Sequence, residues 1–157
     1  MKINTTNLIL RQFTEDDVHE AYQYLSDEQV MKYIEPPFCL EQTREFILEY
    51  GCEKNMVYAV EEKRTGKVIG HAIFHPYDSL DEYEIGWILD RSCWGKGYAV
   101  ELSKALISYA FKVKHAKRIV AETVRSNQRA LAVIKKLGMQ ESDERSGTLL
   151  KLFEFHA

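Results

Sequence analysis

The chain has 157 residues, of which 45% are hydrophobic and 29% charged, a balance typical of one folded domain over residues 1–157. Its net charge of -3 excludes a strongly basic surface, so no nucleic-acid partner is expected. Three scattered cysteines favour reduced thiols, and no apolar run reaches the ~20 residues of a membrane span. With no apolar signal region in residues 1–6, we expect a cytoplasmic protein without a membrane partner.

The first predicted elements are a strand and an amphipathic helix. The strand covers Leu8–Phe13, and Thr14 then acts as the N-cap of the helix, with Asp17 three residues later. The 3.6-residue period places on one helical stripe Val18, Ala21, Tyr22 and Leu25.

Two further helices are predicted before the chain changes to strands. A short one over Glu28–Tyr33 ends before a Pro-Pro pair, which forbids its continuation. The next covers Leu40–Tyr50, turns Phe46 and Ile47 inward and stops at Gly51.

The middle of the chain predicts three strands. Met56–Glu61 and Val68–Phe74 form a hairpin around the turn Arg64–Lys67. In the third strand, Tyr83–Leu89, one face has Tyr83, Ile85, Trp87 and Leu89, and the other has Glu84, Gly86 and Ile88.

The longest predicted helix covers Tyr98–Val113. Its inward face is formed by Leu102, Ala105, Leu106, Tyr109, Ala110 and Val113. A strand over Arg118–Thr123 and a helix over Asn127–Leu137 follow, the helix with Asn127 as its N-cap and Gly138 beyond its end.

Two short strands, around Met139–Glu141 and over Thr148–Phe155, end the chain. With the short helix over Glu28–Tyr33 left out, the order of elements is β-α-α-β-β-β-α-β-α-β-β. It predicts an α/β (α+β) domain of three layers, with a mixed central sheet of about seven strands and helices on both faces.

The segment Leu89–Ala99 joins a strand to the longest helix and contains Gly95, Lys96 and Gly97. Glycines there allow close backbone approach, and N–H groups at a helix N-terminus bind phosphate or pyrophosphate. The alternative is a plain strand-to-helix turn. The segment matches neither the P-loop nor the dinucleotide fingerprint.

A second marker is Asn127-x-x-Ala130 with Leu137-Gly138-Met139 at the end of the same helix. Alone it indicates helix capping only. Together the two segments resemble the motifs of the GNAT superfamily of N-acetyltransferases, [QR]-x-x-G-x-[GA] followed by N-x-x-[AS] and L-G-[FM]. Gly97 and Ala99 fill the last two positions of the first motif.

Three more segments, Leu8–Arg11, Ser26–Tyr33 and Glu84–Trp87, resemble the branch that acetylates ribosomal-protein N-termini, the RimJ/RimL-like enzymes. The resemblance covers nearly the whole chain. It implies a GNAT-like fold, acetyl-CoA as co-substrate, an amine acceptor and no metal. A homodimer is an expectation at the level of the family.

The resemblance also implies which residues bind the coenzyme. The pantetheine arm would pair with the strand residues Trp87, Ile88 and Leu89. Backbone amides would hold the pyrophosphate, and these belong to Trp94, Gly95, Lys96, Gly97, Tyr98 and Ala99. Asn127 would contact the coenzyme.

The chain departs from the family pattern at two positions. Trp94 stands at the [QR] position, and Ile134 stands where many relatives have a tyrosine as general acid. Ala130 fits the motif but lacks the hydroxyl that some relatives carry there. A coenzyme A thiol with a pKa of ~8.5 is a tolerable leaving group near neutral pH, so water or a backbone dipole could replace that acid.

Glu84 is the predicted catalytic base, acting directly or through water, because it lies in the polar phase of its strand. An exposed edge-strand carboxylate is the equally open alternative, and His71 or His75 could serve instead. A base matters more for a lysine amine, pKa ~10.4, than for an α-amine at ~7.7–8.0. Cys93 has no histidine closely before it, so direct transfer in a ternary complex is expected.

The sequence therefore predicts transfer of the acetyl group of acetyl-CoA to a primary amine. The acceptor stays open between a protein N-terminal α-amine and a small molecule such as a polyamine, an amino acid or an aminoglycoside-like amine. The alternative from another class is a non-catalytic acyl-CoA sensor or scaffold with the same fold.

Overall fold

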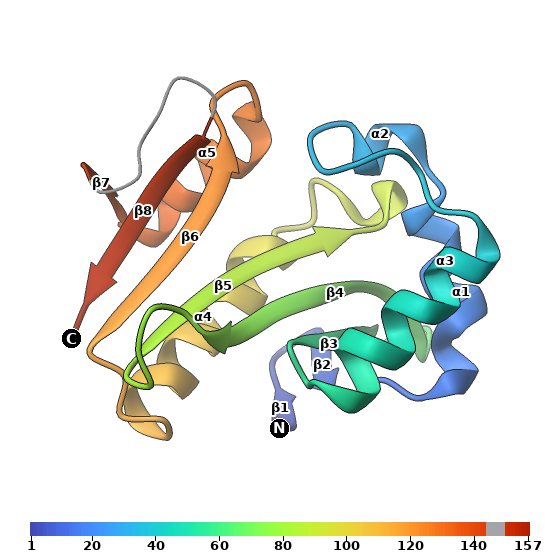
Figure 1. Ribbon diagram of the computed structural model, residues 1–157, viewed down its shortest axis with the longest axis horizontal. Coiled ribbons are helices and arrows are strands. Elements are labelled where there is room, and N and C mark those ends of the chain that lie inside the picture. The colour runs from blue at the N-terminus through green and yellow to red at the C-terminus, as the bar shows by residue number, and fades with distance from the viewer. Residues whose placement is uncertain (144–149) are drawn as a thin grey trace. The chain divides into compact units, whose positions relative to one another are not determined.

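The computed structural model describes residues 1–143 and 150–157. These residues form a sheet of eight strands in the order β1-β2-β3-β4-β5-β6-β8-β7 (Figure 1). β5 pairs with β6 in parallel, whereas β2–β3, β3–β4 and β6–β8 are antiparallel. The predicted mixed α/β fold is confirmed. The additional strand is β1 (Ile3–Asn4), whose two residues are too few to show a period in the sequence.

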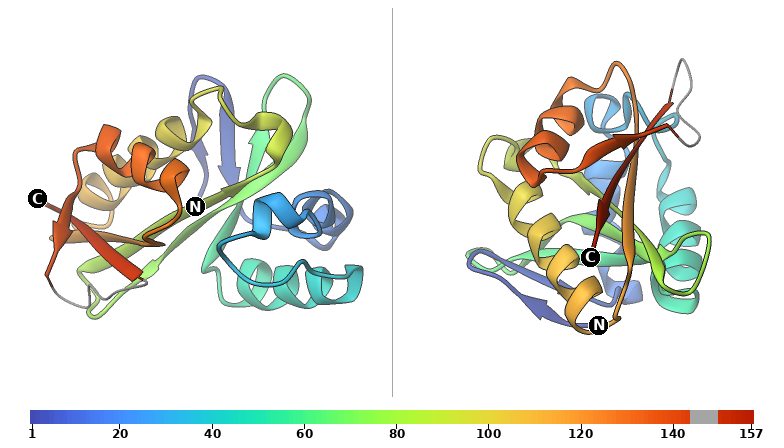
Figure 2. Two further views of the ribbon diagram at one scale, coloured as in Figure 1. Left: turned by 90° about the horizontal axis from the view of Figure 1, so that it is seen from above. Right: turned by 90° about the vertical axis from the view of Figure 1, so that its left-hand side faces the viewer.

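The chain divides into two compact units, and β4 and β5 contribute residues to both. Unit 1 comprises Met1–Ile73 and Trp87–Tyr98, and unit 2 comprises Phe74–Gly86 and Ala99–Ala157. The helices and strands from the first half of the chain belong to unit 1: β1, β2 (Leu8–Arg11), α1 (Val18–Leu25), α2 (Glu28–Met31), α3 (Leu40–Phe46), β3 (Val57–Glu62) and most of β4 (Lys67–Pro76). Within unit 1, α1 packs beside both α2 and α3 (Figure 2).

Arg11 ties the first strand of unit 1 to its neighbours. Its guanidinium donates to Glu61 on β3 at 2.8 Å and to both carboxylate oxygens of Asp17 at 2.9 Å. Asp17 also accepts from the backbone N–H of Thr14 at 2.8 Å, as the predicted pairing of these two residues requires. Burial raises the pKa of Asp17, but the bonds from Arg11 and Thr14 outweigh burial and leave it below its usual value.

The prediction that the third helix stops at Gly51 is wrong. The chain continues beyond α3 as a π-helical segment over Ile47–Glu53. A Cβ at Gly51 would lie 2.8 Å from Cδ2 of Phe13, closer than carbon atoms approach. The glycine therefore allows this segment to pack against Phe13, and it does not terminate the helix.

A second glycine sets the distance between β4 and β5. A Cβ at Gly70 would lie 2.2 Å from the carbonyl oxygen of Ile88. The next residue pair confirms the contact, because the N–H of Asp90 donates to the carbonyl of Ile69 at 2.7 Å. Gly70 thus fixes where the last residues of β5 lie in unit 1.

Unit 2 contains the elements of the second half of the chain. They are the first part of β5 (Glu82–Leu89), most of α4 (Tyr98–Lys112), β6 (Arg118–Val124), α5 (Gln128–Leu137), β7 (Gln140–Ser142) and β8 (Leu150–His156). α5 lies beside β6 (Figure 2). Of the predicted strand Thr148–Phe155, residues 148 and 149 lie outside the described residues.

The capping predictions for α5 are confirmed, and one core prediction for α4 is wrong. Asn127 accepts a hydrogen bond from the N–H of Ala130 at 3.2 Å, and Gly138 ends the helix with φ 76°. Val113 was expected on the buried face of α4, but it follows the last helical residue and is 56% exposed. In the described part of the chain, no helix is long and apolar enough to cross a membrane.

The contact between Gly51 and Phe13 predicts that an alanine at position 51 destabilises the protein. Glycine to alanine normally stabilises a helix by up to ~1 kcal/mol. Gly51→Ala should instead lower the free energy of unfolding by about 1–3 kcal/mol, because the methyl group overpacks Phe13. Urea denaturation measures this difference. A neutral or stabilising effect would contradict the packing described for this segment.

Candidate functional site

The segment between β5 and α4 lies wholly in unit 1 up to Tyr98. It begins with a 3₁₀ turn over Arg91–Cys93, in which the Asp90 carboxylate accepts from the N–H of Ser92 at 2.9 Å. The indole Nε1 of Trp94 donates to the carbonyl of Leu89 at 3.0 Å. The Trp94 side chain therefore stabilises the loop to which it belongs, which explains how an aromatic residue can stand at the [QR] position of the motif.

The two loop glycines have the backbone geometry that the sequence predicts. Gly95 has φ 79° and Gly97 φ 78°, in the left-handed region that side chains disfavour. A Cβ at either position would meet no heavy atom within 4 Å, so neither glycine is explained by crowding. Both lie directly before the 15-residue helix α4, whose first turn contains Tyr98 and Ala99. The loop can thus approach a ligand closely at a helix N-terminus.

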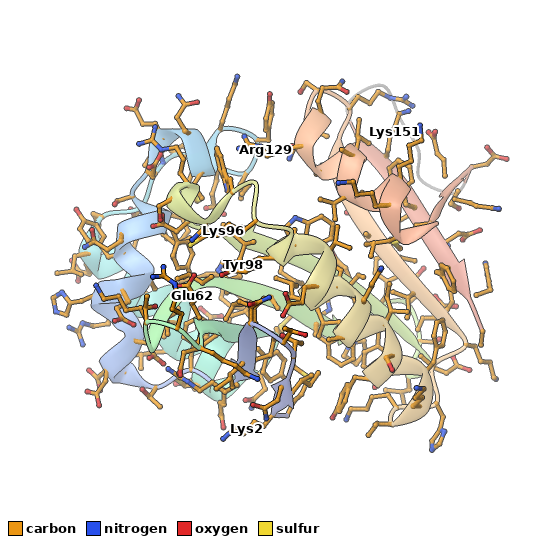
Figure 3. The ribbon with its side chains drawn as sticks, turned by 180° about the vertical axis from the view of Figure 1, so that it is seen from behind. Lys2, Glu62, Lys96, Tyr98, Arg129 and Lys151 are labelled. Carbon is orange, nitrogen blue, oxygen red and sulfur yellow. The ribbon has the colours of Figure 1, made fainter. Side chains whose placement is uncertain are left out.

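A buried carboxylate anchors the end of this loop. Glu62, the last residue of β3, is only 3% exposed and accepts from the Tyr98 hydroxyl at 2.8 Å. It also accepts from Thr65 at 2.9 Å and lies 3.6 Å from the Lys96 ammonium. Figure 3 shows the side chains of Glu62, Lys96 and Tyr98 gathered at one place.

These contacts determine the charge states in the cluster of Glu62, Lys96 and Tyr98, which we call the Glu62 cluster. The bond from Tyr98 is the largest influence on Glu62 and holds the pKa of that carboxyl below its usual value against the effect of burial. The same bond raises the pKa of Tyr98. Glu62 is consequently ionised at neutral pH, and the ammonium group of Lys96, which lies between the two loop glycines in the sequence, is already paired with this carboxylate.

Sequence reasoning did not find Glu62. The residue reads as one of two adjacent glutamates at the end of a strand, where a solvated side chain is the usual outcome. Its burial depends on the packing of β3 against the loop that follows β5. Nothing in the local sequence signals that packing.

Cys93 lies next to the loop but is buried at 5% exposure. Burial raises the pKa of its thiol, which keeps the sulfur protonated. The structure therefore gives no support for this thiol as a nucleophile.

Glu84 lies in unit 2, in the first part of β5, and contacts His75 from β4. His75 Nε2 is 3.3 Å from Glu84 Oε2, and the two side chains are 19% and 22% exposed. Burial raises the pKa of the Glu84 carboxyl, Glu122 on β6 adds to the effect, and His75 opposes it. Glu84 is thus a half-enclosed carboxylate beside an imidazole, unlike a solvated edge-strand residue.

His71, the other candidate base, lies inside the core of unit 1. It is 1% exposed, and its Nδ1 is 3.0 Å from the Tyr24 hydroxyl. Burial lowers the pKa of His71 to about 3, so the ring is neutral at all physiological pH values. Tyr24, rather than the predicted Tyr22, is the fully buried tyrosine of α1.

The remaining predicted coenzyme residues fall in two places. Trp87, Ile88 and Leu89 form the end of β5 in unit 1, and Ile88 packs against the hydrophobic cluster of that unit. Asn127 belongs to unit 2, where its side-chain oxygen caps α5. Among the described residues, no group of three or more His, Cys, Asp and Glu side chains is placed to hold a metal ion.

Comparison with known proteins places these features in a family. The family model described as an acetyltransferase (GNAT) domain matches residues 7–140. The chain belongs to the GNAT acetyltransferase family. It is therefore an acetyltransferase enzyme, and the GNAT fold is one that binds acetyl-CoA or CoA.

Individual relatives agree with this assignment. The uncharacterized N-acetyltransferase YnaD of Bacillus subtilis (strain 168) is 35% identical over 141 residues, which cover 89% of this chain and 83% of YnaD. The crystal structure of a GNAT-family acetyltransferase from Bacillus anthracis has a TM-score of 0.91 and 30% identity, covering 99% of this chain and 98% of the other.

A more distant structure shares the fold alone. The spermidine N-acetyltransferase from Vibrio cholerae, in complex with CoA and spermine, has a TM-score of 0.79 and 18% identity, covering 96% of each chain.

The contribution of the Glu62 cluster to stability can be tested by removing the hydroxyl oxygen of Tyr98. Tyr98→Phe should lower the free energy of unfolding by about 1.5–3 kcal/mol at neutral pH, because a buried carboxylate loses a hydrogen bond. Folding lowers the pKa of Glu62, so this stabilisation is present at neutral pH and is lost as the pH falls. Denaturation at several pH values should show the effect of Tyr98→Phe shrinking in acid.

Tyr77→Phe is the matched control, because Tyr77 also donates to a carboxylate, that of Glu122 at 3.0 Å, but in an exposed position. Its loss should stay below about 1 kcal/mol. Equal losses in the two variants would show that the burial of Glu62 does not strengthen its bond.

Proposed function

We propose that the protein transfers the acetyl group of acetyl-CoA to a primary amine by direct attack in a ternary complex. One observation carries the proposal: two left-handed glycines with open space around them lie directly before the N-terminus of a long helix. Backbone N–H groups from Trp94 to Ala99 would hold the coenzyme pyrophosphate there, at the positive end of the helix dipole.

The pantetheine arm is proposed to follow the end of β5. The parallel ladder between β5 and β6 covers Glu82–Glu84 of β5. Trp87, Ile88 and Leu89 lie beyond that ladder on the same strand, so the arm could pair with their backbone like a further strand. Asn127, in this proposal, contacts the coenzyme as well as capping its helix.

Glu84 is the proposed base. The amine nitrogen attacks the thioester carbonyl, the new C–N bond forms, and backbone N–H groups stabilise the oxyanion. The C–S bond then breaks, and the coenzyme leaves as a thiolate that takes a proton from water. Half-burial of Glu84 supports its role, because a carboxyl with a raised pKa is a stronger base than a solvated one.

The acceptor that we favour is a protein N-terminal α-amine, as the resemblance to the RimJ/RimL-like branch suggests. An α-amine is partly neutral at pH 7 and so makes modest demands on the base. A small amine is the second candidate, since a spermidine N-acetyltransferase shares the fold. Release of free thiol with a member of an amine panel would identify the class and would exclude a non-catalytic acyl-CoA sensor.

Gly97→Glu should abolish binding of acetyl-CoA in a calorimetric titration in which the unaltered protein binds with micromolar affinity. The new side chain fills the open space of the loop and brings a negative charge to the phosphate site. ATP and NAD are the competing ligands to be tested alongside.

Gly66→Glu is the matched control, because Gly66 has a similar φ of 69° and equally open surroundings but lies in the β3–β4 turn. It carries the same backbone strain and the same added charge, and should leave binding intact. Equal binding of acetyl-CoA by the unaltered protein and by Gly97→Glu would contradict the assignment of the loop as the pyrophosphate site.

A further inference from the structure

The hydrogen bonds of His75 determine which of its two ring nitrogens carries a proton beside Glu84. His75 Nδ1 lies 2.8 Å from the carbonyl oxygen of Pro76. A carbonyl has no hydrogen to give, so Nδ1 must be the donor and carries a proton. In a neutral ring, Nε2 then has a bare lone pair, and this is the atom 3.3 Å from Glu84 Oε2.

A lone pair and a carboxylate oxygen repel each other at this distance unless a proton lies between them. Such a proton can belong to the imidazole or to the carboxyl, and either arrangement makes a hydrogen bond assisted by charge. The backbone bond at Pro76 thus orients the ring so that it and Glu84 compete for a single proton.

Other charged groups bear on this pair. Val120 on β6 is the register partner of Glu84, and Glu122 lies two residues further along β6 on the same face of the sheet. The Glu122 carboxylate accepts a hydrogen bond from the Tyr77 hydroxyl. Its negative charge raises the pKa of the Glu84 carboxyl. On β5 itself, Glu82 is paired with Arg118 at 3.2 Å, which leaves its charge largely compensated.

We propose that His75 and Glu84 act as one proton-accepting unit, in which Glu84 takes the proton from the attacking amine and His75 shares it through Nε2. This rests on the proposed amine acetylation and adds His75 as a positioning residue that sets the strength of the base. When the product leaves, the pair returns its proton to water, which neutralises the hydroxide left by protonation of the coenzyme thiolate.

The pair has a consequence for the pH dependence of the reaction. The unit is active only when the shared proton is absent, so kcat/KM should rise with pH as the pair loses that proton. In His75→Gln the amide can still donate to Glu84, but it cannot take up a proton. The pair as a whole holds its last proton more tightly than a carboxyl without the imidazole does, so in this variant the rising limb should move to lower pH. The maximal kcat should fall about ten-fold, as expected for a weaker base.

The kinetic test compares the unaltered enzyme with H75Q, E84Q and the double variant between pH 5.5 and 9.5. An alanyl peptide and butylamine serve as acceptor probes, with thiol release as the signal. E84Q should lose about 10²- to 10⁴-fold in kcat/KM. The double variant should lose about as much as E84Q alone, because the two groups act as a unit. The KM for acetyl-CoA should stay unchanged in every variant.

His156→Gln is the matched control. His156 Nε2 also lies 3.3 Å from a carboxylate oxygen, that of Glu154, but on β8 and with 61% of its side chain exposed. This variant should reproduce the pH profile of the unaltered enzyme. A limb that stays in place in H75Q, or that moves equally in H156Q, would overturn the proposal.

A second measurement follows the protonation of the His75–Glu84 pair directly and needs no enzymatic turnover. In an NMR titration, the ring resonances of His75 and the carboxyl resonance of Glu84 should change together over one pH interval, with assignment by H75Q among the five histidines. Separate intervals would overturn the pairing. If no amine supports thiol release, the proposed acetylation fails and the catalytic role of the pair falls with it, while a joint titration would still establish the pairing itself.

Discussion

The end of β5, and with it the loop that follows, depends on a contact between two backbones that only glycine permits. A side chain at Gly70 would coincide with the carbonyl oxygen of Ile88, so any other residue would displace one of the two strands. The adjacent bond from Asp90 to Ile69 uses the same close approach. This contact sets the starting point of the loop, because the chain turns out of the sheet immediately afterwards. The strand residues proposed to meet pantetheine are located by the same constraint.

The other end of the loop is held by an ionised group. Glu62 binds the hydroxyl of Tyr98 at the first position of α4, and this fixes the helix N-terminus relative to β3. Between the two fixed ends, Gly95 and Gly97 supply conformations that other residues disfavour. A loop ordered before its ligand arrives loses less entropy on binding, and its N–H groups need little reorganisation.

Features that depend on local chemistry could be predicted from the sequence, and features that depend on tertiary packing could not. Asn127 was predicted as an N-cap because its partner lies three residues away. Gly51 was misread because the ring that demands it is far away in the chain, at Phe13. The same division applies to the site. The loop glycines and Glu84 follow from strand and turn patterns, whereas the burial of Glu62 and the contact of Glu84 with its histidine require strands from different parts of the chain.

The pairing of Lys96 with Glu62 changes the electrostatic character of the loop. A lysine free to reach a polyphosphate would contribute a point charge, whose attraction weakens as salt is added. Here that charge is 3.6 Å from a buried carboxylate, so the backbone dipoles at the helix end contribute a larger share of the attraction for an anion. Recognition by such dipoles depends on the direction of each N–H bond rather than on net charge. The affinity of the loop for its ligand should therefore vary less with ionic strength than that of a loop with a free lysine, and strongly with the geometry of the phosphate groups.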